Sequence, residues 1–263
     1  MRSILSILTL STTLLFANSG KEIFNQKCSS CHQNYIPQSK LLINYEFDNS
    51  DLNLSAPTLV ELSFALKDQV GDRKADKESQ LMEIENFLND YINSPNREKT
   101  ILPQAVIKHF KTMPSMQGQI DEDEIELLAE YMFDYAEKTI IKHSVQRHTY
   151  EEALIKAKKE NKIILIEGYI PFCRGCMQMD REVLVEKQVK EALDKDFILV
   201  KKNVLTEKLP LELKSLGTPS FYFITNDGKK VIDNIQGTGT VDEFLELLEG
   251  IKSNLEKGVF LKK

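Results

Sequence analysis

Two closely spaced cysteine pairs constrain this chain more than any other feature. Cys28 and Cys31 are followed at once by His32, whereas Cys173 and Cys176 are followed by a methionine. Four cysteines are too few for a disulfide scaffold in a chain of 263 residues, so each pair needs a local explanation. The motif C-x-x-C-H is typical of covalent haem c attachment, and C-x-x-C after a strand is typical of a redox-active dithiol. The sequence therefore predicts two redox groups in one chain.

The N-terminus predicts export. An uncharged stretch rich in Leu and Ile, residues 3–16, follows Arg2, and small residues stand after it at Ala17 and Ser19. This order predicts a cleaved signal peptide over residues 1–19. A retained membrane anchor is the alternative, but the apolar run is shorter than the ~20 residues that span a bilayer. No later stretch is apolar enough to span a membrane, so we expect the mature protein in an oxidising compartment, the periplasm of a bacterium.

Length and charge divide the rest of the chain in two. The length after the signal exceeds one typical domain. Residues 20–147 carry 14 Lys and Arg against 21 Asp and Glu, whereas residues 148–263 carry 19 of each. An acidic surface is a poor partner for nucleic acid. It either attracts basic redox partners or only solvates the domain. The sequence does not predict an oligomeric state.

The first half predicts two helices that pack against each other. Gly20, Phe24 and Cys28 recur every four residues and share one face of a short helix. Four acidic residues, 121–124, favour the start of a second helix because they interact with its dipole. The apolar stripe of that helix consists of Ile125, Leu128, Met132 and Tyr135.

With these motifs, residues 20–137 resemble a class I cytochrome c. The opening from Gly20 to His32 is similar to the family's N-terminal helix and haem motif, and residues 127–131 are similar to its C-terminal helix. Met113, followed by proline, stands where the family has its second iron ligand. The resemblance implies an all-α domain that holds one covalent haem c through Cys28 and Cys31. His32 and Met113 would be the iron ligands, a pair that raises the reduction potential.

Parts of this half depart from the family or leave alternatives open. A segment containing Pro57 resembles the one whose backbone steadies the haem imidazole, but it lies farther from His32 than usual. Residues 33–55 form an insertion of unpredicted role. The first cysteine pair could instead be a simple disulfide or part of a zinc site. The methionine that we expect at the iron could instead fill the core, and Met116 and then His109 are the other candidate ligands.

After a predicted linker over residues 138–147, the second half alternates helices and strands. An apolar run, residues 163–166, is typical of a strand buried on both faces. Asn226-Asp227-Gly228 is a strong hairpin signal. The other predicted strands are 197–200, 220–225 and 230–235, and the predicted helices are 149–160, a long charged segment from Cys176 to Lys195, 209–216 and 241–255.

This order resembles an α/β thioredoxin-like domain, with a central sheet flanked by helices, over residues 148–258. The whole chain is therefore predicted as multidomain, an all-α cytochrome c-like domain followed by this α/β domain. In the thioredoxin family a proline before the hairpin is cis and faces the disulfide, and the resemblance implies this role for Pro219. The family also buries a carboxylate six residues before the first cysteine, which implies that role for Glu167.

The position of the second pair predicts its chemistry. Cys173 stands at a helix N-terminus beside Arg174, and both features lower the pKa of a thiol. We therefore expect Cys173 to be the nucleophile and Cys176 the resolving thiol, with Glu167 exchanging the proton of Cys176.

Departures from the family and alternatives remain for this pair too. Phe172 and Met177 replace the family's usual Trp and Lys, which leaves the potential open. The pair could also be an inert disulfide or a metal site. Glu167 could lie at the surface, and Pro219 could be a trans turn proline.

Together the motifs predict a periplasmic redox protein with a haem for electron transfer and a dithiol. In the first hypothesis the two groups exchange electrons directly. Thioredoxin-type dithiols lie at about −270 to −120 mV, below a Met/His haem, so electrons would flow to the haem. The dithiol would then have to release its electron pair singly. In the second hypothesis the chain is a thiol-disulfide oxidoreductase of exported proteins, and the haem serves a separate partner. A haem-bearing docking or sensing module is the third.

Overall fold

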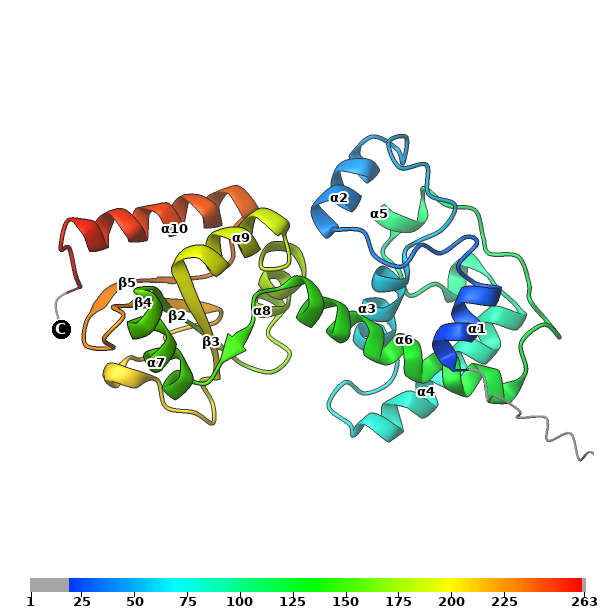
Figure 1. Cartoon of the computed structure of the whole chain (residues 1–263). Coiled ribbons are helices and arrows are strands. Elements are labelled where there is room, and N and C mark those ends of the chain that lie inside the picture. Colours follow the sequence, from blue (N-terminus) through cyan, green and yellow to red (C-terminus); the bar gives the residue numbers. More distant parts are fainter. Residues whose placement is uncertain (1–18, 262–263) are drawn as a thin grey trace, which may run out of the picture.

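The computed structural model describes residues 19–261 and consists of two domains. Figure 1 shows a helical domain and an α/β domain, connected by a long helix that runs from the first toward the second. Of the predicted signal peptide only Ser19 is described, because residues 1–18 lie outside the described residues. Within residues 19–261, no helix has the length and apolar character needed to cross a bilayer.

The N-terminal domain is all-α. Its elements are α1 (Gly20–Lys27), α2 (Gln38–Glu46), α3 (Leu59–Gln69), α4 (Lys77–Asn93), the 3₁₀ turn η1 (Arg97–Lys99), α5 (Gln104–Ile107) and α6 (Glu122–His143). Ser19, Thr58 and Asp121 begin α1, α3 and α6 with capping boxes, in which the cap side chain and a glutamate three residues later satisfy each other's backbone N–H groups. Short polar caps therefore fix where these helices begin.

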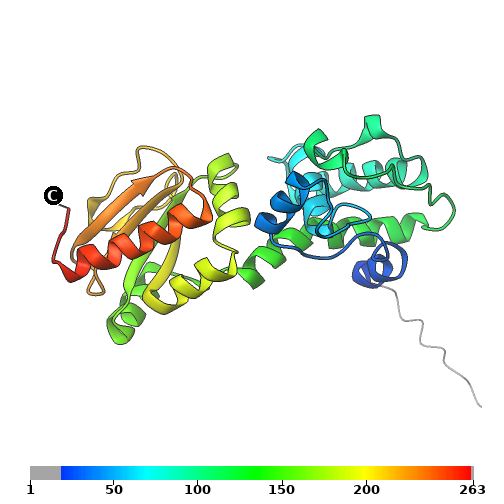
Figure 2. The same ribbon diagram turned by 90° about the horizontal axis from the view of Figure 1, so that it is seen from above.

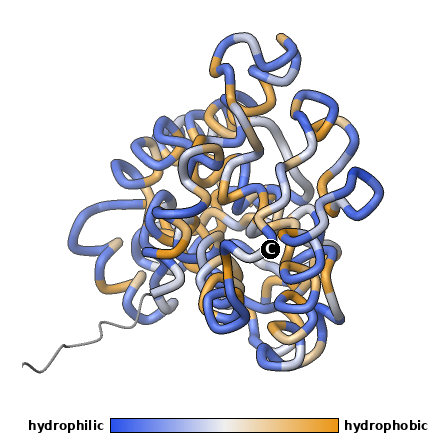
Figure 3. Tube along the Cα trace, turned by 90° about the vertical axis from the view of Figure 1, so that its right-hand side faces the viewer, coloured by the Kyte–Doolittle hydropathy of each residue, from blue (hydrophilic) through white to orange (hydrophobic). Residues whose placement is uncertain are grey.

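The two helices predicted at the ends of this half pack against each other, as expected. The Phe24 and Tyr131 rings lie 6.0 Å apart at the contact of α1 with α6. Gly20 sits so close to α6 that a Cβ atom there would lie 1.9 Å from the Leu127 carbonyl oxygen. The shared core includes Phe24, Leu128 and Met132. Figure 3 shows such apolar segments in orange toward the middle of the molecule and polar ones in blue at its periphery.

The segments predicted as linker and insertion are both structured. Helix α6 continues through the predicted linker to His143, so the connection between the domains is mostly helical. The insertion, residues 33–55, contains α2, whose Ser39 hydroxyl donates a 2.7 Å hydrogen bond to Glu186 of the second domain. The insertion therefore contributes to the contact between the domains.

The second domain is built on a five-stranded sheet with strand order β1-β3-β2-β4-β5. The strands are β1 (Arg147–His148), β2 (Ile163–Tyr169), β3 (Phe197–Asn203), β4 (Ser220–Ile224) and β5 (Val231–Gln236). β3 is parallel to β1 and β2, whereas β4 is antiparallel to β2 and β5. The predicted strands are thus confirmed, and the two-residue β1 is an addition.

Helices cover both faces of this sheet (Figure 2). They are α7 (Tyr150–Glu160), α8 (Arg174–Gln178), the π-helical η2 (Met179–Val183), α9 (Lys187–Asp196), the 3₁₀ turn η3 (Pro210–Glu212) and α10 (Val241–Glu256). Side chains of α9 and α10 pack on one face with Leu165, whereas α7 packs on the other with Ile164. Alternate residues of β2 thus face opposite layers, which explains its continuous apolar run.

One predicted helix is wrong, and another is divided. Residues 209–216 form only η3, because Leu211 and Glu212 have φ of 54° and 59°, which a helix does not tolerate. The segment continues as a loop toward Pro219. The charged segment after the second cysteine pair is divided into α8, η2 and α9.

Candidate functional site

The second cysteine pair forms a disulfide at the start of α8. Cys173 is the N-cap, and its Sγ accepts hydrogen bonds from the Cys176 backbone N–H (3.1 Å) and the Thr218 hydroxyl (3.3 Å). Cys173 is half-buried, whereas Cys176 is buried. An incoming sulfur can therefore reach Cys173 more easily than Cys176, and the two donors stabilise a thiolate at Cys173.

Pro219 lies against this disulfide turn. The Thr218–Pro219 peptide bond is cis, as the resemblance implied, so the trans alternative is wrong. A Cβ atom at Gly175 would lie 3.0 Å from Pro219 Cδ, which shows how closely the proline approaches the C-x-x-C turn. Phe172, just before the pair, has a φ of 60° and a half-exposed ring. Such backbone strain in a bulky residue is typical of functional sites.

Glu167 is fully buried in β2, so the alternative that it lies at the surface is wrong. Burial raises the pKa of its carboxyl to about 7, and the nearby Asp180 carboxylate adds to the rise. Lys201 opposes it from 2.9 Å. No side chain within residues 19–261 donates a well-aligned hydrogen bond to either Glu167 oxygen. A carboxyl with a pKa near neutrality can both accept and return a proton at physiological pH.

Three charged residues around Glu167 were missed by sequence reasoning. Lys201 Nζ also lies 2.5 Å from Asp180 Oδ2, and Arg147 Nη2 lies 2.5 Å from Asp180 Oδ1. Lys201 stands opposite Glu167 in the parallel register of β2 and β3. The sequence carries a signal for the pair of Glu167 and Lys201, because each of the two directly follows a four-residue apolar run in its strand. Asp180 and Arg147 come from η2 and β1 and have no comparable signal.

Comparison with known proteins agrees with this geometry. Residues 150–252 match the family of thioredoxin-like domains. Residues 150–252 of this chain form a thioredoxin-like domain. The match does not extend to the helical domain, whose resemblance to cytochrome c stays a prediction.

Relatives of the thioredoxin-like domain include longer proteins. A protein disulfide-isomerase of Triticum aestivum is 33% identical over 98 residues, which are 37% of this chain and 18% of that protein. An uncharacterised protein of Aquifex aeolicus is 28% identical over 116 residues, 43% of this chain and 71% of that protein. A thioredoxin structure from Thermus thermophilus is 25% identical, with a TM-score of 0.37, and the match covers 41% of this chain and 87% of that one. The chain thus spans under a fifth of the isomerase.

The first cysteine pair lies at the end of α1, and its thiols are unpaired. Cys28 is the C-cap of α1 and is partly buried, which raises its thiol pKa to about 11, whereas Cys31 is exposed. Cys28 is therefore a poor nucleophile at neutral pH. Within the described residues, no three His, Cys, Asp or Glu side chains converge on a common point. Among the described residues, the first cysteine pair therefore has no group of side chains with it that could complete a zinc site.

His32 is held by the backbone of the Pro57 segment. Its Nδ1–H donates a 2.7 Å hydrogen bond to the Pro57 carbonyl, and burial lowers its pKa. The ring is thus neutral, with its Nε2 lone pair available to a ligand, which is the arrangement that metal-bound histidines usually have. The long separation of Pro57 from His32 in sequence does not prevent this contact.

The three candidates for the second iron ligand lie in two different parts of the helical domain. Met113 and Met116 are half-buried and pack against the same core as Cys28 and Phe24. His109 instead stacks on Tyr45, with ring centroids 5.1 Å apart, and its Nε2 is buried without a hydrogen-bond partner among the described residues. The two methionines therefore share the environment of the cysteine pair, and the structure does not place His109 there.

Proposed function

We propose that this chain is an exported thiol-disulfide oxidoreductase whose Cys173–Cys176 couple exchanges with cysteines of other proteins. The observation that carries this proposal is a single arrangement: a disulfide whose accessible sulfur accepts two hydrogen bonds, a cis-proline packed on its turn, and a buried carboxyl of raised pKa in the adjacent strand. The predicted signal peptide supports export, and thiol substrates in the periplasm are the expected partners.

The reduction of a substrate disulfide follows from these positions. The Cys173 thiolate attacks one substrate sulfur, and the other substrate sulfur leaves as a thiolate, which gives a mixed disulfide. Glu167 then takes the proton of Cys176, whose sulfur attacks Cys173 Sγ and releases the second substrate sulfur. The substrate gains two electrons, and the couple is oxidised to the disulfide. Glu167 returns the proton of Cys176 to one leaving thiolate, and solvent protonates the other. The reverse sequence oxidises a substrate dithiol.

Catalysis of insulin disulfide reduction tests the proposal. We expect the full chain to accelerate precipitation of the insulin B chain by dithiothreitol. The matched control replaces Cys173 and Cys176 by serine and leaves the first pair intact. Equal rates for the chain and this control would refute the oxidoreductase proposal.

We propose further that the helical domain carries one covalent haem c. The fit rests on two unpaired cysteines at the end of α1, a neutral His32 oriented by Pro57, and methionines that pack in the same core. His32 and Met113 would hold the iron, and the group would supply one-electron transfer at a raised potential. In Figures 1 and 2, α1 lies on the side of the helical domain away from the thioredoxin-like domain. This placement favours separate partners for the haem and the dithiol over direct exchange.

Haem attachment is tested by export in a host that matures c-type cytochromes. We expect a covalent haem whose absorption spectrum persists after denaturation, and its loss when Cys28 and Cys31 are both replaced by alanine. The reduction potential should fall in Met113→Ala, because the methionine ligand raises it, and stay unchanged in Met116→Ala. A colourless wild-type protein would exclude the haem. A potential that changes in His109→Ala and not in Met113→Ala would reassign the ligand.

A further inference from the structure

Arg73 of the helical domain contacts the residues that flank the dithiol. Arg73 belongs to the loop between α3 and α4. Its Nη2 lies 3.2 Å from Met177 Sδ, and its guanidinium carbon lies 5.3 Å from the centre of the Phe172 ring. Phe172 directly precedes Cys173, and Met177 directly follows Cys176. The guanidinium therefore contacts the residues on both sides of the C-x-x-C motif.

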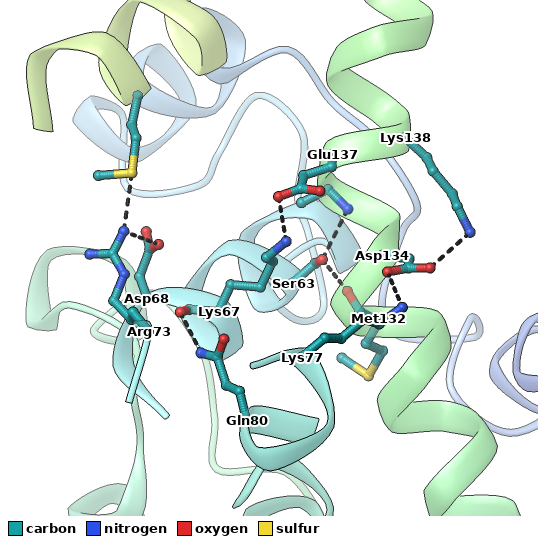
Figure 4. A network of polar contacts seen from close by, with 12 residues as sticks. Ser63, Lys67, Asp68, Arg73, Lys77, Gln80, Met132, Asp134, Glu137 and Lys138 are labelled. Carbon is teal, nitrogen blue, oxygen red and sulfur yellow. Dashed lines mark hydrogen bonds and ion pairs between the residues drawn. The ribbon is translucent and has the colours of Figure 1, made fainter. Parts of the chain in front are cut away.

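A carboxylate of the helical domain holds this arginine in place. Asp68, in the last turn of α3, lies 3.2 Å from Arg73 Nη2. The same carboxylate pairs with Arg181 of η2 through both of its oxygens, at 2.5 and 3.2 Å. Arg181 also lies over the Phe64 ring, 3.9 Å from its centre. Figure 4 shows Asp68 and Arg73 side by side, with the Arg73 contact running to the helix of the second domain.

The charge balance of this contact is positive. One carboxylate serves two guanidinium groups, and all three side chains are at most 30% exposed, so solvent screens them only in part. Removing Arg73 would leave the neutral Asp68–Arg181 pair, whereas removing the Asp68 charge would leave two cations. The two changes therefore alter the local charge in opposite directions.

A nearby cation stabilises a thiolate relative to a thiol and a disulfide. Cys173 carries the thiolate of the reduced site, so a positive contact at its flank lowers its pKa and favours the reduced form. Five charged residues of the second domain lie on the elements that carry or adjoin the pair, and they stay the same in the variants considered below. They are Arg174 on α8, Glu167 on β2, Lys201 on β3, Asp180 on η2 and Arg147 on β1.

We infer that Arg73 is a positioning residue of the dithiol site, supplied by the helical domain, and that its charge stabilises the Cys173 thiolate. This inference rests on the proposed oxidoreductase function and deepens it. The helical domain thus tunes the thiol chemistry of the second domain. Asp68 opposes this effect while it orients the guanidinium.

Two neutral variants of the full chain test the inference. Arg73→Gln should lower the thiolate fraction of Cys173 about threefold at a pH below its pKa. At a pH above that pKa, it should shift the equilibrium with glutathione about threefold toward the disulfide, or ~14 mV. Asp68→Asn should shift both quantities in the opposite direction. The thiolate fraction is measured from the pH dependence of alkylation at Cys173, followed by mass spectrometry of its peptide.

Two further variants separate charge from structure. Arg73→Lys keeps the charge and should retain the wild-type values. Lys77→Gln removes a helical-domain cation that pairs with Asp134 at 3.0 Å instead, and should change neither quantity. Shifts of Arg73→Gln and Asp68→Asn in the same direction would show a structural role and overturn the inference, as would no shift in either. If the wild-type chain fails to reduce insulin, the proposed function fails, but these two measurements still decide the role of Arg73.

Discussion

Cys173→Ser is expected to abolish disulfide exchange, on the order of 10³-fold or more, because a covalent mechanism loses its nucleophile. Cys176→Ser should have a different effect. Cys173 would still attack a substrate disulfide, but no second thiol could resolve the product. The Cys176 variant should therefore accumulate a mixed disulfide with its substrate, which non-reducing electrophoresis and intact mass measure directly.

The difference between these two variants assigns the roles of the sulfurs. It follows from exposure, since Cys173 is half-buried and its partner is 3% exposed. Ser is nearly isosteric with Cys, so both variants should keep the fold, which circular dichroism checks. Trapped mixed disulfides in Cys173→Ser rather than Cys176→Ser would reverse the assignment. Full exchange activity in Cys173→Ser would mean that this pair is not the catalytic one.

Gly20→Ala is expected to destabilise the helical domain by about 3 kcal/mol, or roughly 10 °C in Tm for a domain of this size. The added methyl would lie 1.9 Å from the Leu127 carbonyl oxygen and 2.7 Å from Tyr131 Cβ. One is a backbone atom of α6 and the other is a Cβ atom attached directly to that backbone, so neither can rotate away. The helices must separate, and the core that they share must open.

Gly250→Ala is the matched control for this substitution. Gly250 lies within α10, and a Cβ atom there would have nothing within 4 Å. Replacing a helical glycine by alanine without a clash should stabilise by about 0.5–1 kcal/mol. Thermal unfolding measures both variants. An unchanged Tm in Gly20→Ala would contradict the close approach of α1 and α6.

Elements with a strong local signal could be predicted from the sequence. The four longer strands of the sheet followed from β-branched runs and from the Asn226-Asp227-Gly228 turn, and the start of α6 followed from its acidic residues. The helix expected over residues 209–216 failed because its composition is compatible with a helix, whereas its backbone turns at Leu211 and Glu212. Local propensity does not contain the tertiary contacts of this segment, in which Leu209, Leu211 and Leu213 pack against the side of the sheet that α7 covers.

The candidate site was predicted in part. Cys173, Cys176 and Pro219 stand in motifs of fixed spacing, and the structure brings all three together. The burial of Glu167 followed from the resemblance, but its interaction with Asp180 and Arg147 did not, because those residues come from η2 and β1. The contact of Arg73 with Phe172 and Met177 could not be predicted, since it depends on how two domains dock.

The amino-acid sequence by itself determined the positions of two cysteine motifs, the strands that carry one of them and the helix ends that bracket the other. These features depend on spacing, capping and periodicity, which act over a few residues. Only the tertiary structure decided that Glu167 shares its charge environment with residues of β1, β3 and η2, and that a loop of the helical domain reaches the residues beside the disulfide. The contacts of Arg73 and Arg181 join residues more than 100 positions apart, and those around Glu167 join residues of separate elements, so no local pattern records which side chains meet.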